Sequence, residues 1–101
     1  MQDQGEVMRL IRMLKCRDIN LRWKAARQLT ECGDSALEPL LRKIYDDDTG
    51  VRLLAIWVLG KIGSSQALDP LRTSSFDEDE CIQAASLGAI DRISRRFSTT
   101  N

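Results

Sequence analysis

The chain has 101 residues, enough for one small domain or one block of a repeat array. Fifteen Lys and Arg residues balance fifteen Asp and Glu residues, which argues against nucleic acid or an anionic membrane as the main partner. The lack of histidine excludes His-dependent catalytic triads and most zinc sites, and three cysteines without CxxC spacing predict a reduced, cytoplasmic protein.

Hydrophobic residues recur at helical spacing from near the start of the chain. They predict a short helix over residues 6–15, a second over residues 21–32 and, after a Gly-containing turn, a third over residues 35–45. In the third helix Ser35 and Glu38 have the spacing of a capping box, in which the Ser hydroxyl accepts a hydrogen bond from the Glu amide. The second and third helices are therefore expected to form a helical hairpin.

The pattern then repeats at spacings of 30 and 31 residues, as the aspartates Asp18, Asp48 and Asp79 show. Six helices are predicted, the last over residues 79–96. If the two helices of a hairpin are named A and B, the order reads B-A-B-A-B-A, and both terminal helices are expected to lack a hairpin partner. This periodicity predicts an all-α fold, an α-solenoid in which each hairpin buries its apolar face against its neighbours.

The apolar residues that share one face in every repeat predict the core and leave no segment for a membrane. No run of uncharged residues approaches the ~20 that a membrane-spanning helix needs. The predicted core comprises Leu10, Leu14, Leu21, Ala25, Leu29, Leu37, Leu40, Ile44, Val51, Ala55, Ile56, Leu59, Ile62, Leu68, Leu71, Ile82, Leu87, Ile90 and Ile93.

Residues 48–71 carry the pattern Asp-x-x-Val-Arg-x-x-Ala-x-x-x-Leu-Gly-x-Ile-Gly, followed by Ala-Leu-x-Pro-Leu. This pattern resembles the short HEAT-like repeat first associated with phycobilisome lyases. Residues 18–41 match it well, and residues 79–93 are a degraded copy. Proteins with such repeats include scaffolds, bilin lyases and phycobilisome-degradation proteins, many of them prokaryotic.

The resemblance also implies the organisation of the chain. It implies a single HEAT-like domain over residues 6–97, with residues 1–5 and 98–101 as flexible termini. Within the domain the helices are expected to stack into a short right-handed superhelix.

The aspartates and arginines of the motif have a structural interpretation. Asp18, Asp48 and Asp79 precede helix N-termini, where a carboxylate accepts hydrogen bonds from unpaired amides and opposes the helix dipole. Arg22 and Arg52 lie four residues after their aspartates and are expected to reach carboxylates in adjoining loops. These residues predict an inter-repeat ladder of caps and ion pairs, with a catalytic carboxylate or an anion-binding arginine as the alternative.

The acidic runs at residues 46–48 and 77–80 do not have the pattern of a calcium loop. Gly50 and Trp57 occupy positions where that loop requires ligands. The runs are interpreted as solvated loops at helix N-termini, so no metal or cofactor is predicted. Cys81 begins a helix, but the neighbouring acidic residues oppose its thiolate form, and no catalytic residue is predicted.

The middle A helix has more apolar residues than a stack needs. Trp57 falls directly opposite the predicted core on a helical wheel, with Leu53 and Leu54 to either side. The positions equivalent to Trp57 and Leu53 in the preceding repeat hold Arg27 and Trp23. The tryptophans and Leu53 are expected to lie roughly 10 Å apart on the convex surface, as the anchors of an interface. The alternative is that a terminus of the chain covers Trp57.

Basic residues on the B helices form a second candidate surface. Arg12, Arg42 and Lys43 are expected on the concave side, where they form a weak groove for acidic or phosphate groups or are simply solvated. The leading prediction is a non-enzymatic protein–protein interaction or scaffold module that binds another protein or a second copy of itself. The alternative is an accessory subunit of a bilin lyase or a phycobilisome-degradation factor. Nucleic-acid binding is least favoured because the net charge is zero.

Overall fold

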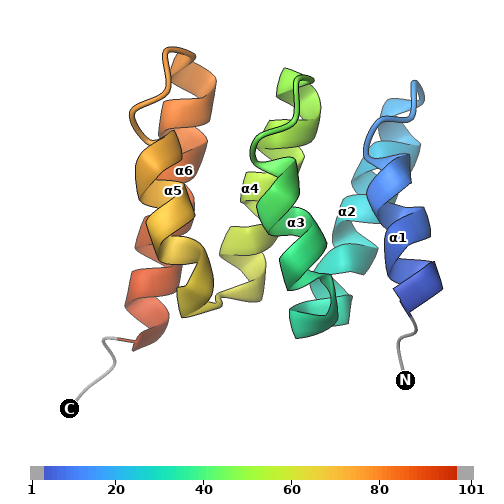
Figure 1. Cartoon of the computed structure of the whole chain (residues 1–101), viewed down its shortest axis with the longest axis horizontal. Coiled ribbons are helices and arrows are strands. Elements are labelled where there is room, and N and C mark those ends of the chain that lie inside the picture. The colour runs from blue at the N-terminus through green and yellow to red at the C-terminus, as the bar shows by residue number, and fades with distance from the viewer. Residues whose placement is uncertain (1–3, 98–101) are drawn as a thin grey trace.

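The computed structural model describes residues 4–97, which form six α-helices in a stack of three pairs (Figure 1). The helices are α1 (Gln4–Met13), α2 (Ile19–Cys32), α3 (Leu37–Lys43), α4 (Thr49–Ile62), α5 (Leu68–Ser74) and α6 (Glu80–Phe97). The short 3-10 segments η1 (Gly33–Ala36) and η2 (Ser65–Ala67) connect α2 to α3 and α4 to α5. The predicted all-α solenoid is confirmed. Residues 98–101 and most of residues 1–5, where flexible termini are predicted, lie outside the described residues.

The helices form two layers, an A layer of α2, α4 and α6 and a B layer of α1, α3 and α5. The B layer lies in front of the A layer in the view of Figure 1. Neighbouring A helices contact each other along the stack, α2 against α4 and α4 against α6. Each A helix therefore has neighbours in its own layer as well as in the B layer.

The closest pairs across the layers join each B helix to the A helix that follows it, α1 with α2, α3 with α4 and α5 with α6 (Figure 1). The prediction that both terminal helices lack a partner is therefore wrong. The A helices α2 and α4 each lead into a one-turn 3-10 segment that carries the chain to the next helix pair of the stack. Each B helix instead ends in an open loop, such as residues 14–18, which lets the chain fold back so that the next A helix packs against this B helix.

Most of the predicted core is buried between the two layers. The most deeply buried large side chains include Leu14, Leu29, Leu40, Ile44, Ile56, Leu59, Leu71, Ile82 and Ile93. Ile62, Leu68 and Ile90 are only partly buried against this core. Val58 and Ala89, which the sequence analysis did not assign to the core, are buried as well, because α4 and α6 also pack against a neighbour within the A layer.

Two predicted core residues are exposed. Leu21 keeps 38% of its surface accessible and Leu87 keeps 58%. Their equivalents in the middle repeat, Val51 and Ile56, are fully buried. Because Leu21 lies in the first A helix and Leu87 in the last, each faces away from the stack, where no further pair of helices covers it within the described residues.

The predicted capping box at Ser35 does not form. Ser35 lies inside η1, α3 begins only at Leu37, and the residue before it, Ala36, makes no side-chain capping hydrogen bond. The chain enters α3 from this 3-10 turn, in which the backbone N–H of Leu37 donates to the carbonyl of Asp34, so Ser35 is not the N-cap of the helix.

Candidate functional site

The three motif aspartates cap the three A helices. The Oδ1 of Asp18 accepts from the amides of Asn20 at 2.9 Å and Leu21 at 3.4 Å. The same atom of Asp48 accepts from the amide of Val51 at 3.2 Å. In α6, Asp79 accepts from the amides of residues 81 and 82 at 2.7 and 3.2 Å. These contacts satisfy amides that have no partner inside the helix, which is a structural role.

The motif arginines tie α2 and α4 each to the end of the B helix before it. Arg22 Nε donates to the carbonyl of Cys16 at 2.6 Å, and Arg52 Nε donates to that of Ile44 at 3.2 Å. Only Arg52 of these two forms an ion pair with a carboxylate of the next loop, that of Asp77. Carbonyls at a helix C-terminus carry partial negative charge, so a guanidinium there holds the two helices of a B/A pair together.

The acidic loops are more closely packed than solvated loops would be. The side chain of Asp46 is only 7% exposed and lies 3.3 Å from Lys15. A hydrogen bond from the amide of Asp48, at 3.2 Å, and this lysine lower the pKa of Asp46. The amide of Asp79 donates to Asp77 at 2.8 Å and, with Arg52, lowers its pKa as well. Among residues 4–97 no group of three or more His, Cys, Asp or Glu residues could hold a metal ion.

The cations predicted for the concave surface are largely occupied by carboxylates of their own repeat. Arg42 lies 3.7 Å from Glu38, and Lys43 lies 3.8 Å from Asp46. Arg12 is exposed on α1. The B layer thus offers paired charges rather than a groove of cations.

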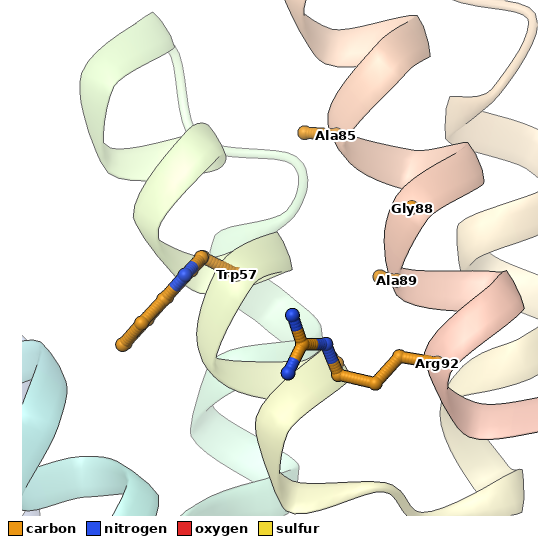
Figure 2. Close-up of a pocket in the computed structure, with 6 residues that line it drawn as sticks. Trp57, Ala85, Gly88, Ala89 and Arg92 are labelled. Atoms are coloured by element: carbon orange, nitrogen blue, oxygen red, sulfur yellow. The ribbon is translucent and has the colours of Figure 1, made fainter.

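The two tryptophans lie in direct contact on the outer face of the A layer, the face turned away from the B layer. Their ring centroids are 5.2 Å apart at an interplanar angle of 86°, an edge-to-face arrangement. Figure 2 shows Trp57 projecting from α4 away from α6. Trp23 remains 40% exposed, Trp57 is partly buried, and the ammonium of Lys61 lies 5.4 Å from the Trp57 ring centroid. The contact is closer than the spacing of roughly 10 Å predicted for neighbouring A helices.

Leu54 does not belong to this exposed surface. It is only 7% exposed and forms part of the core, and Leu53 is partly buried beside it. The prediction that Leu54 is exposed was wrong, because a helical wheel that considers only the B layer overlooks burial between neighbouring A helices. Arg27 is exposed on α2, as predicted for the outer face.

Shallow hollows flank the tryptophan pair on both sides. The hollow between α4 and α6 has a volume of about 210 Å³, and Figure 2 shows its lining residues. These residues are Trp57, Gly60, Ala85, Gly88, Ala89 and Arg92. The hollow between α2 and α4 has a volume of about 220 Å³ and is lined by Ile19, Arg22, Trp23, Gly50, Leu53 and Leu54.

The α4/α6 hollow exists because the facing side chains are small. A Cβ atom added at Gly60 would lie 3.0 Å from Ala89 Cβ and 3.1 Å from its Cα, so the two helices are already in contact there. Ala85 and Gly88 leave open space above this contact. The sequence analysis missed these residues. The available signal was the spacing of small residues along one face of α6.

The cysteines show no reactive arrangement. All three are free, and Cys32 is buried in the core. Burial raises the pKa of the Cys32 thiol, and the nearby carboxylates of Glu6 and Glu31 raise it further. The neutral thiol is therefore favoured at this position.

The fold and this surface define the chain as a helical-repeat protein, an α-solenoid whose outer layer carries an aromatic patch. The chain belongs to the HEAT-repeat family, since the family model described as HEAT repeats matches residues 7–91. HEAT repeats are commonly protein-interaction scaffolds and typically non-catalytic. A comparison with curated proteins finds no match. None of the helices in residues 4–97 has the length and apolar character required to cross a membrane.

Proposed function

We propose that the chain is a non-enzymatic protein-binding module whose contact surface is the outer face of the A layer. The observation that carries this proposal is the edge-to-face pair of Trp23 and Trp57, set between two apolar hollows. Exposed aromatic side chains beside a recess are the usual anchors of protein interfaces, because they bury a large area at low cost in conformational entropy.

The size of the hollows favours side chains of a partner protein over a bound cofactor. Sites for small molecules typically have volumes of about 300–1,000 Å³. The hollows beside the tryptophans, of about 210 and 220 Å³, are smaller and open to the surface. Each has room for one large apolar side chain.

The charges around the tryptophan pair favour an acidic partner. Lys61 lies beside the Trp57 ring, and Arg92 forms part of the wall of the α4/α6 hollow (Figure 2). Arg27 is exposed on α2. Because complementary charge speeds encounter and fixes orientation, the favoured partner presents large apolar side chains flanked by Asp or Glu.

Peptide selection tests this proposal without knowledge of the natural partner. Peptides from a random-sequence display library are selected on the wild-type chain, synthesised, and their affinities measured by fluorescence anisotropy. We expect the selected peptides to combine large apolar and acidic residues. Trp57→Ala should weaken their binding by about tenfold or more, the effect of losing an interface anchor.

The matched control for this experiment is Arg12→Ala, on the exposed surface of the B layer. It should leave the affinities unchanged, and circular dichroism should show that both variants are folded. Peptides that bind Trp57→Ala and Trp23→Ala as tightly as wild type, and lose affinity with Arg12→Ala, would place the binding surface on the B layer.

The resemblance of residues 48–71 to phycobilisome-lyase repeats suggests a second function, an accessory role in bilin attachment or phycobilisome degradation. The small volume of the two hollows argues against a bilin bound at the tryptophan pair. Mixing the chain with phycocyanobilin and recording the absorbance spectrum separates the two functions. An unchanged spectrum argues against the second.

A further inference from the structure

The two end faces of the stack retain apolar side chains at positions that are buried in its interior. On the first helix pair, α1 and α2, Leu21 is exposed, whereas its equivalents Val51 and Ile82, which have a preceding pair beside them, are fully buried. On the last helix pair, α5 and α6, Leu87 is more than half exposed, whereas its equivalent Ile56 is fully buried. Terminal repeats that act as caps carry polar residues on their outer side, and these two leucines do not fit that role.

The polar residues on the two end faces are complementary. Gly60 of α4 faces Ala85 and Ala89 of α6 where the two helices meet. The position equivalent to Gly60 on the last helix is Asp91. The positions equivalent to Ala85 and Ala89 on the first A helix are Lys24 and Gln28. Thus the last helix pair presents the carboxylate of Asp91, which lies 3.1 Å from Arg95 of its own helix, where the first pair presents an ammonium and an amide.

From this complementarity we infer that the chain associates head to tail, with the last helix pair (α5 and α6) of one copy covering the first helix pair (α1 and α2) of the next. In this arrangement α6 meets α2 of the next copy as α4 meets α6 within one chain. The register places Leu87 against Leu21 of the next copy, and Asp91 beside its Lys24. Because the stack consists of three B/A pairs, the helix order continues without interruption from one copy to the next.

The geometry of this contact determines how the assembly grows. The two contacting surfaces are different, so the interface is heterologous and a free end remains after each addition. We expect a contact between single helix pairs to be smaller than a standard protein interface of about 1,600 Å². We therefore expect weak association, with an average mass that rises steadily with concentration instead of reaching the mass of a dimer.

Blocking one end at a time tests the inference. Leu87→Glu disables the end face formed by the last helix pair, and Leu21→Glu disables the end face formed by the first. Both substitutions are at exposed positions, so both variants should fold, as circular dichroism can verify. Sedimentation equilibrium up to millimolar concentration should show association of the wild-type chain and a monomer for each variant alone.

The decisive sample is an equimolar mixture of the two variants. Each variant keeps one intact end face, and the two intact faces are complementary, so the mixture should form a 1:1 dimer that does not grow further. A wild-type chain that stays monomeric throughout, or single variants that associate as wild type does, would overturn the inference.

Two further variants separate this contact from other surfaces. Lys24→Asp should weaken association, and combining it with Asp91→Lys in the same chain should restore it, because the charges are exchanged across the interface. Trp57→Ala should leave the association unchanged. If Trp57→Ala abolishes it, the copies meet through the outer face of the A layer and the head-to-tail arrangement is wrong. Failure of the peptide-binding experiment would leave this test unaffected.

Discussion

Helix α4 packs against both neighbouring A helices, but the two contacts use side chains of very different size. Toward α2 the contact includes Leu54 and the edge-to-face pair of Trp23 and Trp57. Toward α6 it is made by Gly60 and Ala89, whose backbones lie almost in contact. The positions of α6 that are equivalent to Leu54 and Trp57 hold Ala85 and Gly88, so the repeat is the same and the side chains differ.

This difference explains the shape of the outer face. Large residues between α2 and α4 fill the space between the helices and raise an aromatic ridge above it. Small residues between α4 and α6 bring the helices together and leave a recess beside Trp57 (Figure 2). An interaction surface with a ridge and an adjacent recess thus arises from unequal side chains on one regular scaffold.

The largest expected effect concerns the α2/α4 contact. Leu54→Ala should lower the free energy of unfolding by about 2–5 kcal/mol, because it removes buried methyl groups and leaves a cavity. Thermal unfolding followed by circular dichroism measures the loss. The matched control is Leu53→Ala, whose side chain is only partly buried and whose loss should be clearly smaller. Equal losses would mean that Leu54 is not the residue that seals this contact.

An intermediate effect is expected at the α4/α6 contact. Gly60→Val should lower the free energy of unfolding by about 1–3 kcal/mol, because its Cβ would meet both the side chain and the backbone of Ala89. The same measurement on Gly88→Ala is the control, since a Cβ there meets no atom within 4 Å. Replacing this helical glycine should raise stability by roughly 0.5–1 kcal/mol. A tolerated Gly60→Val would show that the close approach is not required.

The smallest effect concerns the loop between α5 and α6, which contains Asp77. The pKa of Asp77 is lowered mainly by the amide of Asp79 and further by Arg52. The unfolded chain therefore takes up this proton first as the pH falls. The stabilisation is complete well above the ordinary pKa of 3.8 and is lost as the pH falls through the lower folded-state value.

Asp77→Asn should accordingly lower the melting temperature slightly at neutral pH and have less effect at acidic pH. Glu78→Gln, an exposed carboxylate in the same loop, is the matched control. A decrease for Asp77→Asn that stays constant from neutral to acidic pH would contradict the assigned role of the charge.

Much of the architecture followed from the repeat period. The spacing of Asp18, Asp48 and Asp79 predicted the six helices and their order. The same spacing placed the aspartates at helix N-termini, where all three accept backbone hydrogen bonds. Such features depend on local backbone chemistry, and a sequence pattern therefore reports them directly.

The candidate surface was only partly predictable. Trp23 and Trp57 were correctly placed on the outer face, because a helical wheel locates side chains relative to a single core direction. Leu54 was misplaced because its burial depends on a second direction, toward the neighbouring A helix. The recess beside Trp57 was missed because Gly60, Ala85 and Gly88 define it through the side chains that they lack.

The sequence by itself determined the class of fold, the number and order of the helices, and the aspartates that cap the A helices, since these depend on period and local hydrogen bonding. Only the tertiary structure decided which helices pair, which leucines the ends of the stack expose, and how closely α4 approaches its two neighbours. Those features depend on the volumes of side chains that meet from distant parts of the chain, and a period contains no information about volume.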